Sequence, residues 1–427
     1  MCTSLTFLHL RLPSSEMSST HEPVHLSDHD RAAFLTLQQP CAQYCIPRLD
    51  QSPHEAPIYF AYLNQGGANV IFKIRHWSQS TPDELPFIFL NAESNRSEAI
   101  PIQYSSLIGQ VLRVNKGLSK TLRSEEVISG FYDHVRPLFS QQARLTTVVN
   151  SSTNDYSLHT DQLSNADLTM FLMDHRGVGL HSKVMANLST KCDAIRKDDT
   201  PHSSPNTSRW GILLPDLSPT PGSSVTIEVK PKWLAQSPTA PPDAIRCRTC
   251  ALQLLKPKDP KVYLCPLQLL DGTRDIVYNW VKGRVAEQMD DSANAAGQTG
   301  KIASHIANYI TEGPVKPLLK HLRVLQSRLD HSGILGRDQL RNFPKEARDI
   351  RDHNLRLAMT LRDCSLYIRI CYTSSRVDPS SLECKVGDLD FKSQDKMDDW
   401  ADKERELLES GAYTRQTADL NCQLAES

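Results

Sequence analysis

The sequence lacks any apolar run long enough to cross a membrane. A membrane-spanning helix needs about 18 consecutive apolar residues, and polar or charged residues interrupt every hydrophobic stretch of these 427 residues well before that length. Residues 1–12 also lack the basic start of a secretory signal, so we expect none. We therefore expect no membrane partner for this chain.

The sequence has almost no net charge, since 48 Lys and Arg stand against 49 Asp and Glu. Proteins that bind nucleic acid through their overall field carry a large positive excess, so we expect no nucleic-acid partner. Positive charge is nevertheless concentrated locally, because residues 228–261 hold seven Lys or Arg and three acids. Such a segment suits a polyanionic ligand, although an ordinary surface patch explains it equally well.

The eleven cysteines follow no disulfide framework. An odd number scattered over a long chain is typical of reduced thiols, so we expect a protein of the nucleus or the cytoplasm. Cys247 and Cys250 form a C-x2-C pair, but a tetrahedral zinc site needs four ligands. Cys265 follows them alone along the chain, so a zinc site is the less favoured interpretation.

Residues 225–232, which read Val-Thr-Ile-Glu-Val-Lys-Pro-Lys, are the most informative stretch. Apolar and polar residues alternate there with the period of a half-buried β-strand. The polar face carries Glu228, Lys230 and Lys232. Pro231 removes one ladder donor, so the strand should end there or lie at the edge of a sheet. A solvated strand face is the ordinary interpretation of such a pattern.

Other segments show helix or strand periodicity. Alternation predicts strands at residues 58–63, 70–77, 109–116 and 363–370, and helical spacing predicts helices at 124–138, 275–288, 315–329, 345–361 and 394–410. The fourth strand would carry Asp363 at the start of its polar face. Polar and Pro/Ser-rich composition predicts a disordered extension at residues 1–55, with a short helix near 31–38, and connections at 198–208 and 290–300.

Four motifs, in this order, resemble those of the inositol-pentakisphosphate 2-kinases. They are a strand–turn–strand with Tyr62, Gly66 and Asn69, the E-x-K-P-K run at 228–232 with Cys-Arg-x-Cys at 247–250, Asp-Cys-Ser at 363–365, and Asp-Leu-Asp-Phe-Lys at 388–392. The resemblance covers residues 58–415, with gaps at 140–210 and 285–345. It implies an α+β fold with two lobes, like that of other inositol polyphosphate kinases, and ATP in the cleft between them.

The resemblance also implies a division of the chain and an activity. An N-terminal lobe would span residues 56–218 with the glycine-rich turn, a C-terminal lobe 219–415 with the other three motifs, and a tail 416–427. The activity would be transfer of the ATP γ-phosphate to the 2-hydroxyl of inositol 1,3,4,5,6-pentakisphosphate, which gives the hexakisphosphate. We expect this small molecule to be the partner of a monomeric protein.

By this resemblance the N-terminal lobe supplies most of the nucleotide contacts. The glycine-rich turn would cover the phosphates of ATP, because backbone N–H groups without large side chains approach them closely. The residues implied in ATP binding are Gly66, Gly67, Ala68, Asn69, Arg113 and Glu228. The chain departs from the family just before this turn, where Asn64 and Gln65 stand in place of Gly-Glu.

The C-terminal lobe would supply the catalytic groups. In phosphoryl transfer a protein mainly positions the reactants and neutralises charge. Asp363 and Asp388 would bind Mg²⁺, which accepts one or two carboxylates, and Asp363 would also accept the proton of the attacking hydroxyl. Lys230 would neutralise the γ-phosphate, and the substrate's phosphates would meet Lys230, Lys232, Lys392 and Lys396. Taken singly, each of these residues is more often an ordinary surface residue.

Two alternatives stay open. A protein of the same fold that binds inositol phosphates without turnover is compatible with the altered turn. It is also compatible with the absence, after residue 290, of the family's N-N-L-[RK]-[IV]-F segment. The second alternative is a nucleic-acid-binding or zinc-binding protein built on the Arg/Cys/Lys stretch. The low net charge and the lack of aromatic residues between the basic ones disfavour it.

Overall fold

The computed structural model describes most of the chain from Val24 onwards. The described residues are 24–25, 43–48, 57–81, 83–92, 98–118, 121–150, 156–163, 166–195, 209–257, 263–289, 297–336, 343–417 and 422–425. The predicted helix near 31–38 and the predicted connection at 198–208 lie outside these ranges. Within the described ranges, no helix combines the length and the apolar composition needed to cross a membrane.

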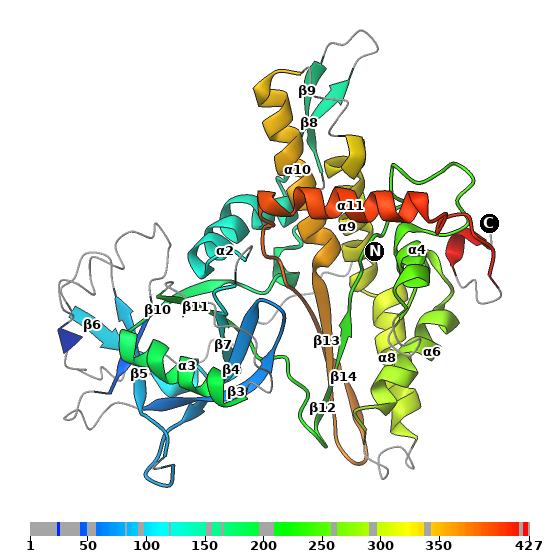
Figure 1. Cartoon of the computed structure of the whole chain (residues 1–427). Helices are drawn as coiled ribbons and strands as arrows, with labels where there is room; N and C mark the ends of the chain where they lie inside the picture. Colours follow the sequence, from blue (N-terminus) through cyan, green and yellow to red (C-terminus); the bar gives the residue numbers. More distant parts are fainter. Residues whose placement is uncertain are drawn as a thin grey trace, which may run out of the picture.

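A nine-stranded sheet forms the N-terminal part of the molecule (Figure 1). Its strands, in spatial order, are β1 (Val24–His25), β6 (Glu98–Pro101), β5 (Phe87–Ala92), β2 (Gln43–Pro47), β10 (Arg176–Leu180), β11 (Trp210–Pro215), β7 (Gln110–Asn115), β4 (Asn69–His76) and β3 (Ile58–Gln65). A further bridge between Ile58 and Phe87 returns β3 to β5, so the sheet curls. Helix α3 (Ser182–Ile195) packs across it over a core that includes Phe60, Phe72 and Leu112.

The strands predicted at 58–63, 70–77 and 109–116 are confirmed as β3, β4 and β7. The disorder predicted for residues 1–55 is wrong at β2, which pairs with β5 and β10 and buries Tyr44, Cys45 and Ile46. A short strand that is buried on both faces shows no alternation, so its sequence carries no period-2 signal.

A three-stranded sheet and a set of helices form the C-terminal part. The sheet runs β12 (Ser224–Val229), β13 (Ser365–Tyr372) and β14 (Val377–Gly387). The helices are α4 (Arg248–Leu255), α5 (Pro266–Asp271), α6 (Arg274–Ala286), α8 (Gln298–Thr311), α9 (Val315–Leu329), α10 (Lys345–Asp363) and α11 (Met397–Glu409). In Figure 1, α6 and α8 flank this sheet on one side and α11 crosses above it. These parts share one core, in which the apolar faces of α8 and α9 meet β12 and β13.

Four of the five predicted helices, at 275–288, 315–329, 345–361 and 394–410, are confirmed as α6, α9, α10 and α11. The stretch at 124–138 is helical but changes type, from α2 (Ser124–Gly130) through a π-helical turn (Phe131–Val135) to a 3₁₀ turn (Arg136–Phe139). The linker predicted at 290–300 is wrong for residues 298–300, where α8 begins. Of that linker, residues 290–296 lie outside the described residues.

The middle of the chain packs against the C-terminal helices. The hairpin of β8 (Arg144–Asn150) and β9 (Tyr156–Gln162) stands beside α10 (Figure 1). Phe131, Leu145 and Phe171 belong to the same core as the apolar faces of α8 and α9. Short 3₁₀ turns occur at Tyr104–Ser106, Thr169–Phe171, Gln394–Lys396 and Gln423–Ala425. The expected division at residue 218 stays a prediction.

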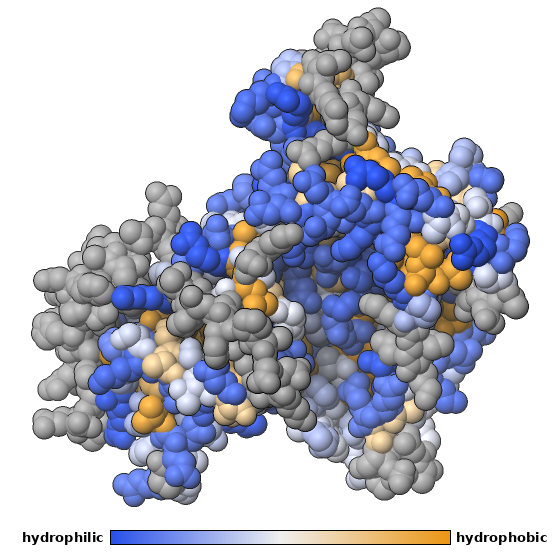
Figure 2. Space-filling view, in the orientation of Figure 1, coloured by the Kyte–Doolittle hydropathy of each residue, from blue (hydrophilic) through white to orange (hydrophobic). Residues whose placement is uncertain are grey.

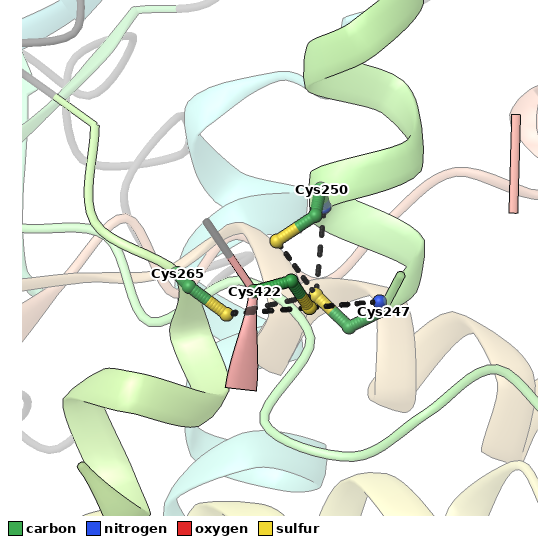
Figure 3. Close-up of side chains that lie close together, drawn as sticks. All are labelled: Cys247, Cys250, Cys265 and Cys422. Atoms are coloured by element: carbon green, nitrogen blue, oxygen red, sulfur yellow. Dashed lines mark hydrogen bonds between the residues drawn. The ribbon is translucent and has the colours of Figure 1, made fainter. Parts of the chain in front are cut away.

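In the folded structure Cys265 lies near other cysteines, so the expectation that it stands alone is wrong. Cys422, which lies 157 residues further along the chain, brings its Sγ to 4.0 Å from the Sγ of Cys265. Together with Cys247 and Cys250 they form a cluster of four buried cysteines (Figure 3). Sequence spacing could not reveal this, because the fourth member comes from the C-terminal tail.

Buried ion pairs fasten α4, α10 and α11 around Trp233. The guanidinium groups of Arg248 and Arg362 lie 4.3 and 3.4 Å from the ring centroid of Trp233. Arg248 Nε donates to Glu404 Oε2 at 2.6 Å, and Arg362 Nη1 donates to Asp330 Oδ2 at 2.7 Å. Burial by itself would raise the pKa of Glu404, but Arg248 and the neighbouring hydroxyls hold it below its usual value.

Glu404 and Glu406 allow a matched test of this arrangement, because Glu404 joins α11 to Arg248 of α4 and Glu406 joins α11 to Lys256, the residue that follows α4. Glu404 is fully buried and also accepts hydrogen bonds from Ser237, Thr239 and Tyr413, whereas the Glu406–Lys256 pair is exposed. We expect Glu404→Ala to lower the free energy of unfolding by about 3–5 kcal/mol, because Arg248 is left buried and unpaired. Glu406→Ala should lower it by less than about 1 kcal/mol.

Urea denaturation of both variants measures this difference. Alanine has the same helix propensity at both positions, so equal losses would contradict the buried-pair account.

Candidate active site

Strand β12 lies at the edge of its sheet, as the position of Pro231 predicts. It pairs antiparallel with β13 from Ser224 to Val229 and ends there. Val225, Ile227 and Val229 are buried while Glu228 is exposed, which confirms the predicted alternation. The alternation stops at Lys232, whose φ of 49° is left-handed. Asp388 has a φ of 55°, and these are the two non-glycine residues with positive φ in the described part of the chain.

A first cluster of charges forms around the buried hydroxyl of Ser365. Its Oγ lies 2.7 Å from Lys230 Nζ, 2.8 Å from Glu228 Oε1 and 3.0 Å from Asp388 Oδ2. Lys230 Nζ also lies 2.9 Å from Glu228 Oε1 and 3.5 Å from Asp388 Oδ2. Because a hydroxyl carries one proton, it serves one carboxylate at a time. The other carboxylate remains available to a cation.

In the first cluster, neighbouring opposite charges keep Glu228 and Lys230 ionised. Burial works against both ions, but Lys230 holds the pKa of Glu228 below its usual value by hydrogen bonding and charge. Glu228 and Asp388 in turn raise the pKa of Lys230 despite its burial. With two carboxylates and one ammonium, the first cluster carries a formal charge of −1.

A second cluster forms around Asp363. Lys232 Nζ lies 3.3 Å from its Oδ1 and Lys392 Nζ lies 3.1 Å from its Oδ2, which gives a formal charge of +1. Asp363 is the last residue of α10 and not the start of a strand, so its expected place on a strand face is wrong. Helix α10 extends two residues beyond the predicted end, and Cys364 is the extended residue before β13. Lys396 lies at the N-terminal end of α11, outside both clusters.

Arg113 and Asp390 join the nine-stranded sheet to the segment that follows β14, close to these clusters. Arg113 of β7 is buried and its Nη2 donates to Asp390 Oδ2. The side-chain oxygen of Asn69, with its amide oriented to match, accepts from Arg113 Nη2 at 2.9 Å. Arg113 therefore connects the glycine-rich turn to the Asp-Leu-Asp segment, and its predicted contact with nucleotide stays a prediction. Figure 2 shows that hydrophilic residues form the surface of the hollow between the two parts of the molecule.

Hydrogen bonds close the glycine-rich turn, and the space beside its two glycines is open. Gly66 N donates to Asn69 O at 2.9 Å, and Lys116 Nζ donates to Gly66 O at 2.7 Å. Asn64 and Gln65, the residues that depart from the family pattern, belong to β3 and pair with Ile71 and Val70. A Cβ added to Gly66 or Gly67 would meet nothing within 4 Å. The Gly66 N–H is therefore used within the turn, and the space beside both glycines is open.

Sequence reasoning did not include Ser365 and Asp390 among the site residues. Ser365 is the centre of the first cluster, and Asp390 holds Arg113 across the two sheets. Both belong to motifs that the sequence analysis identified, Asp-Cys-Ser and Asp-Leu-Asp-Phe-Lys. Membership in these motifs was the available signal, but it did not show which of their residues meet in space.

The fold and the site define an α+β protein with adjacent anionic and cationic clusters, an arrangement suited to a cation and a polyanion. The inositol-pentakisphosphate 2-kinase family profile matches residues 62–406, and the chain belongs to this family. A Yarrowia lipolytica protein named inositol-pentakisphosphate 2-kinase is 31% identical over 224 residues, covering 48% of this chain and 65% of that protein. One of the same name from Debaryomyces hansenii is 28% identical over 207 residues, covering 43% and 50%. The chain thus spans less than two thirds of either relative.

The charge state of Asp363 gives a testable prediction for the second cluster. Burial raises its pKa, but Lys392 and Lys232 outweigh burial and lower the pKa to about 2. A lowered pKa stabilises the folded protein at pH values above the unfolded value of about 3.9. This contribution is lost as the pH falls towards 2.

We expect an NMR titration of the Asp363 carboxyl carbon to give a midpoint well below 3.9. Lys392→Met should raise that midpoint, because it removes the cation with the larger effect. Lys345→Met, which removes the exposed partner of Asp349 on the same helix, should leave it unchanged. An ordinary midpoint in the unmodified protein would show that the second cluster does not form in solution.

Proposed function

We propose that this protein is an ATP-dependent kinase that transfers the γ-phosphate to the 2-hydroxyl of inositol 1,3,4,5,6-pentakisphosphate and releases the hexakisphosphate. Family membership supports this activity, and so do the names of the two relatives. The observation that carries the proposal is the position of the two clusters. Lys230 and Lys232 are two residues apart on one chain segment, and each pairs with a different aspartate.

The first cluster is suited to the nucleotide and its metal ion. Its carboxylates carry more negative charge than Lys230 balances, and carboxylate oxygens are ligands that Mg²⁺ accepts along with phosphate and water. We infer that Asp388 and Asp363 would hold Mg²⁺, which when bound would neutralise charge on the phosphates of ATP. Lys230 then neutralises the γ-phosphate during transfer.

The second cluster is suited to the inositol phosphate. Lys232 and Lys392 supply point charges for its phosphates, with Lys396 at the start of α11 beyond them. Asp363 accepts a hydrogen bond from the 2-hydroxyl and takes its proton as the new O–P bond forms and the bond from the γ-phosphorus to the departing ADP breaks. A carboxylate with so low a pKa is a weak base, but phosphoryl transfer passes through a loose transition state and depends mainly on positioning. Asp363 therefore contributes chiefly by orienting the hydroxyl.

ATP would occupy a cleft between the two sheets, with its phosphates under Gly66, Gly67 and Ala68. The open space beside Gly66 and Gly67 supports this placement. Arg113, which pairs with Asp390 in the described structure, would reach the same phosphates. We also propose that the protein acts as a monomer and is located in the nucleus, the cytoplasm or both.

The activity is tested with purified protein, ATP, Mg²⁺ and inositol 1,3,4,5,6-pentakisphosphate, with the product identified by ³¹P NMR. We expect a new phosphate ester at the 2 position. Asp363→Asn and Asp388→Asn should each reduce turnover by about 10²-fold or more, because each removes a preorganised charge with almost no change in volume. Asp349→Asn, on the exposed face of α10, is the matched control and should retain full activity.

Binding of ATP without product at any Mg²⁺ concentration would replace this proposal with a protein that binds inositol phosphates without turnover. Full activity in Asp363→Asn or Asp388→Asn would remove that residue from the site.

A further inference from the structure

The chain between β14 and α11 carries residues of the site without belonging to a helix or a strand. Residues 388–393 have no regular secondary structure, yet Asp388, Asp390 and Lys392 all take part in the ion pairs described above. Such a segment makes no ladder of backbone hydrogen bonds, so its backbone groups need partners from elsewhere. Side chains of α10 provide them.

Two residues of α10 bond the backbone of residues 390–392. The hydroxyl of Thr360, which is fully buried, accepts from Lys392 N at 3.1 Å and lies 3.3 Å from Asp390 O. Arg356 Nε donates to Lys392 O at 2.6 Å. Both backbone polar groups of Lys392 are therefore bonded to side chains of one helix.

The bond from Lys392 N does not depend on the direction of the Thr360 hydroxyl. Thr360 Oγ1 also lies 2.9 Å from Arg356 O, one turn earlier in its own helix. A hydroxyl has one proton and two acceptor lone pairs. Whether the proton goes to Arg356 O or to Asp390 O, the oxygen can still accept from the Lys392 N–H.

Asp363 lies on the same face of α10. Arg356, Thr360 and Asp363 are spaced by four and then three residues, the spacing of neighbours on a helix surface, and α10 includes all three. Asp363 Oδ2 lies 3.1 Å from Lys392 Nζ. One helix face therefore holds the backbone of Lys392 through two side chains and its ammonium group through a third.

Phe391, the residue before Lys392, is held between α10 and the helical stretch 124–135. The guanidinium of Arg356 lies 4.1 Å from its ring centroid, and the rings of His134 and His353 lie 4.8 and 5.2 Å from it. A Cβ added to Gly130 would come within 2.8 Å of Phe391 Cβ. The segment cannot leave α10 without displacing this buried ring.

We propose that Thr360 and Arg356 are positioning residues that hold Lys392 beside Asp363 for the phosphates of the inositol substrate. This inference rests on the proposed function, which gives Lys392 its role. Both residues act through the backbone of Lys392 and need not touch the substrate. A binding group that is already held in place loses less freedom when its ligand arrives, so loss of either contact should weaken substrate binding.

Hydrogen exchange at the Lys392 amide tests the contact directly. In protein labelled with ¹⁵N-lysine, the resonance of this amide is the one that disappears in Lys392→Arg. Thr360→Val replaces the accepting hydroxyl by a methyl group and should accelerate exchange by about tenfold or more, the equivalent of one hydrogen bond. Thr360→Ser keeps the hydroxyl and should restore slow exchange.

Thr311 of α8 provides the matched control. Its Oγ1 donates to Ala307 O at 2.9 Å, the same bond within a helix that Thr360 makes to Arg356 O. Among the described residues, Thr311 bonds no other segment through this hydroxyl. Thr311→Val should therefore leave exchange at Lys392 unchanged.

Kinetics test the consequence for the site. Thr360→Val should raise KM for inositol pentakisphosphate by about tenfold, because a hydrogen bond to a charged phosphate is weakened. The change in kcat should be smaller. Thr360→Ser should recover the unmodified KM, and Thr311→Val should retain it.

Arg356→Met gives a second variant that decides the question if Thr360→Val fails to fold. It removes the donor to Lys392 O and should both accelerate exchange at Lys392 and raise KM. Arg323→Met, which removes an exposed ion pair between α9 and Asp271, is its control and should change neither.

Unchanged exchange at Lys392 in the folded variants of Thr360 and Arg356 would overturn the proposal. So would an unchanged KM despite faster exchange, or the same rise in KM in Thr311→Val. The exchange measurement requires neither ATP nor inositol phosphate. If the unmodified protein transfers no phosphate, the proposed function fails, while exchange still decides whether Thr360 and Arg356 hold Lys392.

Discussion

Pro231 and the left-handed turn at Lys232 direct Lys230 and Lys232 to different carboxylates. If β12 continued as a regular strand, Lys230 and Lys232 would share one face and repel each other at close range. Instead Lys230 pairs with Glu228 and Asp388 while Lys232 pairs with Asp363. A left-handed backbone conformation is rare for residues other than glycine, and it is retained where the surrounding structure enforces it. Here the buried ring of Trp233, held against Arg248 and Arg362, fixes the chain just after the turn.

The other parts of the site depend on contacts between distant segments. Ser365 places β13 against both acids of the first cluster, and Lys392 reaches Asp363 from the segment after β14. Arg113 connects the nine-stranded sheet to the site through its ion pair with Asp390. A change in any of these segments alters the balance between a cluster of net negative charge and one of net positive charge. In the proposed reaction, that balance would let a metal–nucleotide complex and a polyanionic acceptor bind side by side.

Sequence periodicity was sufficient for several elements with one buried face. It predicted β12 with its end near Pro231, and it predicted α9 from Leu318, Leu322 and Leu325. It failed for β2, which is too short and too buried to alternate, and for the position of Asp363 at the end of α10. Motif resemblance located the segments of the site but not their contacts. The Ser365 network and the approach of Cys422 arise from tertiary folding, which no local pattern encodes.

The division of labour between Lys230 and Lys232 is the central claim, and steady-state kinetics of the two methionine variants test it most directly. Lys230→Met should lower kcat with a smaller change in KM, the pattern of an interaction made chiefly in the transition state. Lys232→Met should mainly raise KM for inositol pentakisphosphate, and high salt should mimic it by screening the substrate's phosphates. The same kinetic defect in both variants, or no dependence on salt in either, would contradict the account.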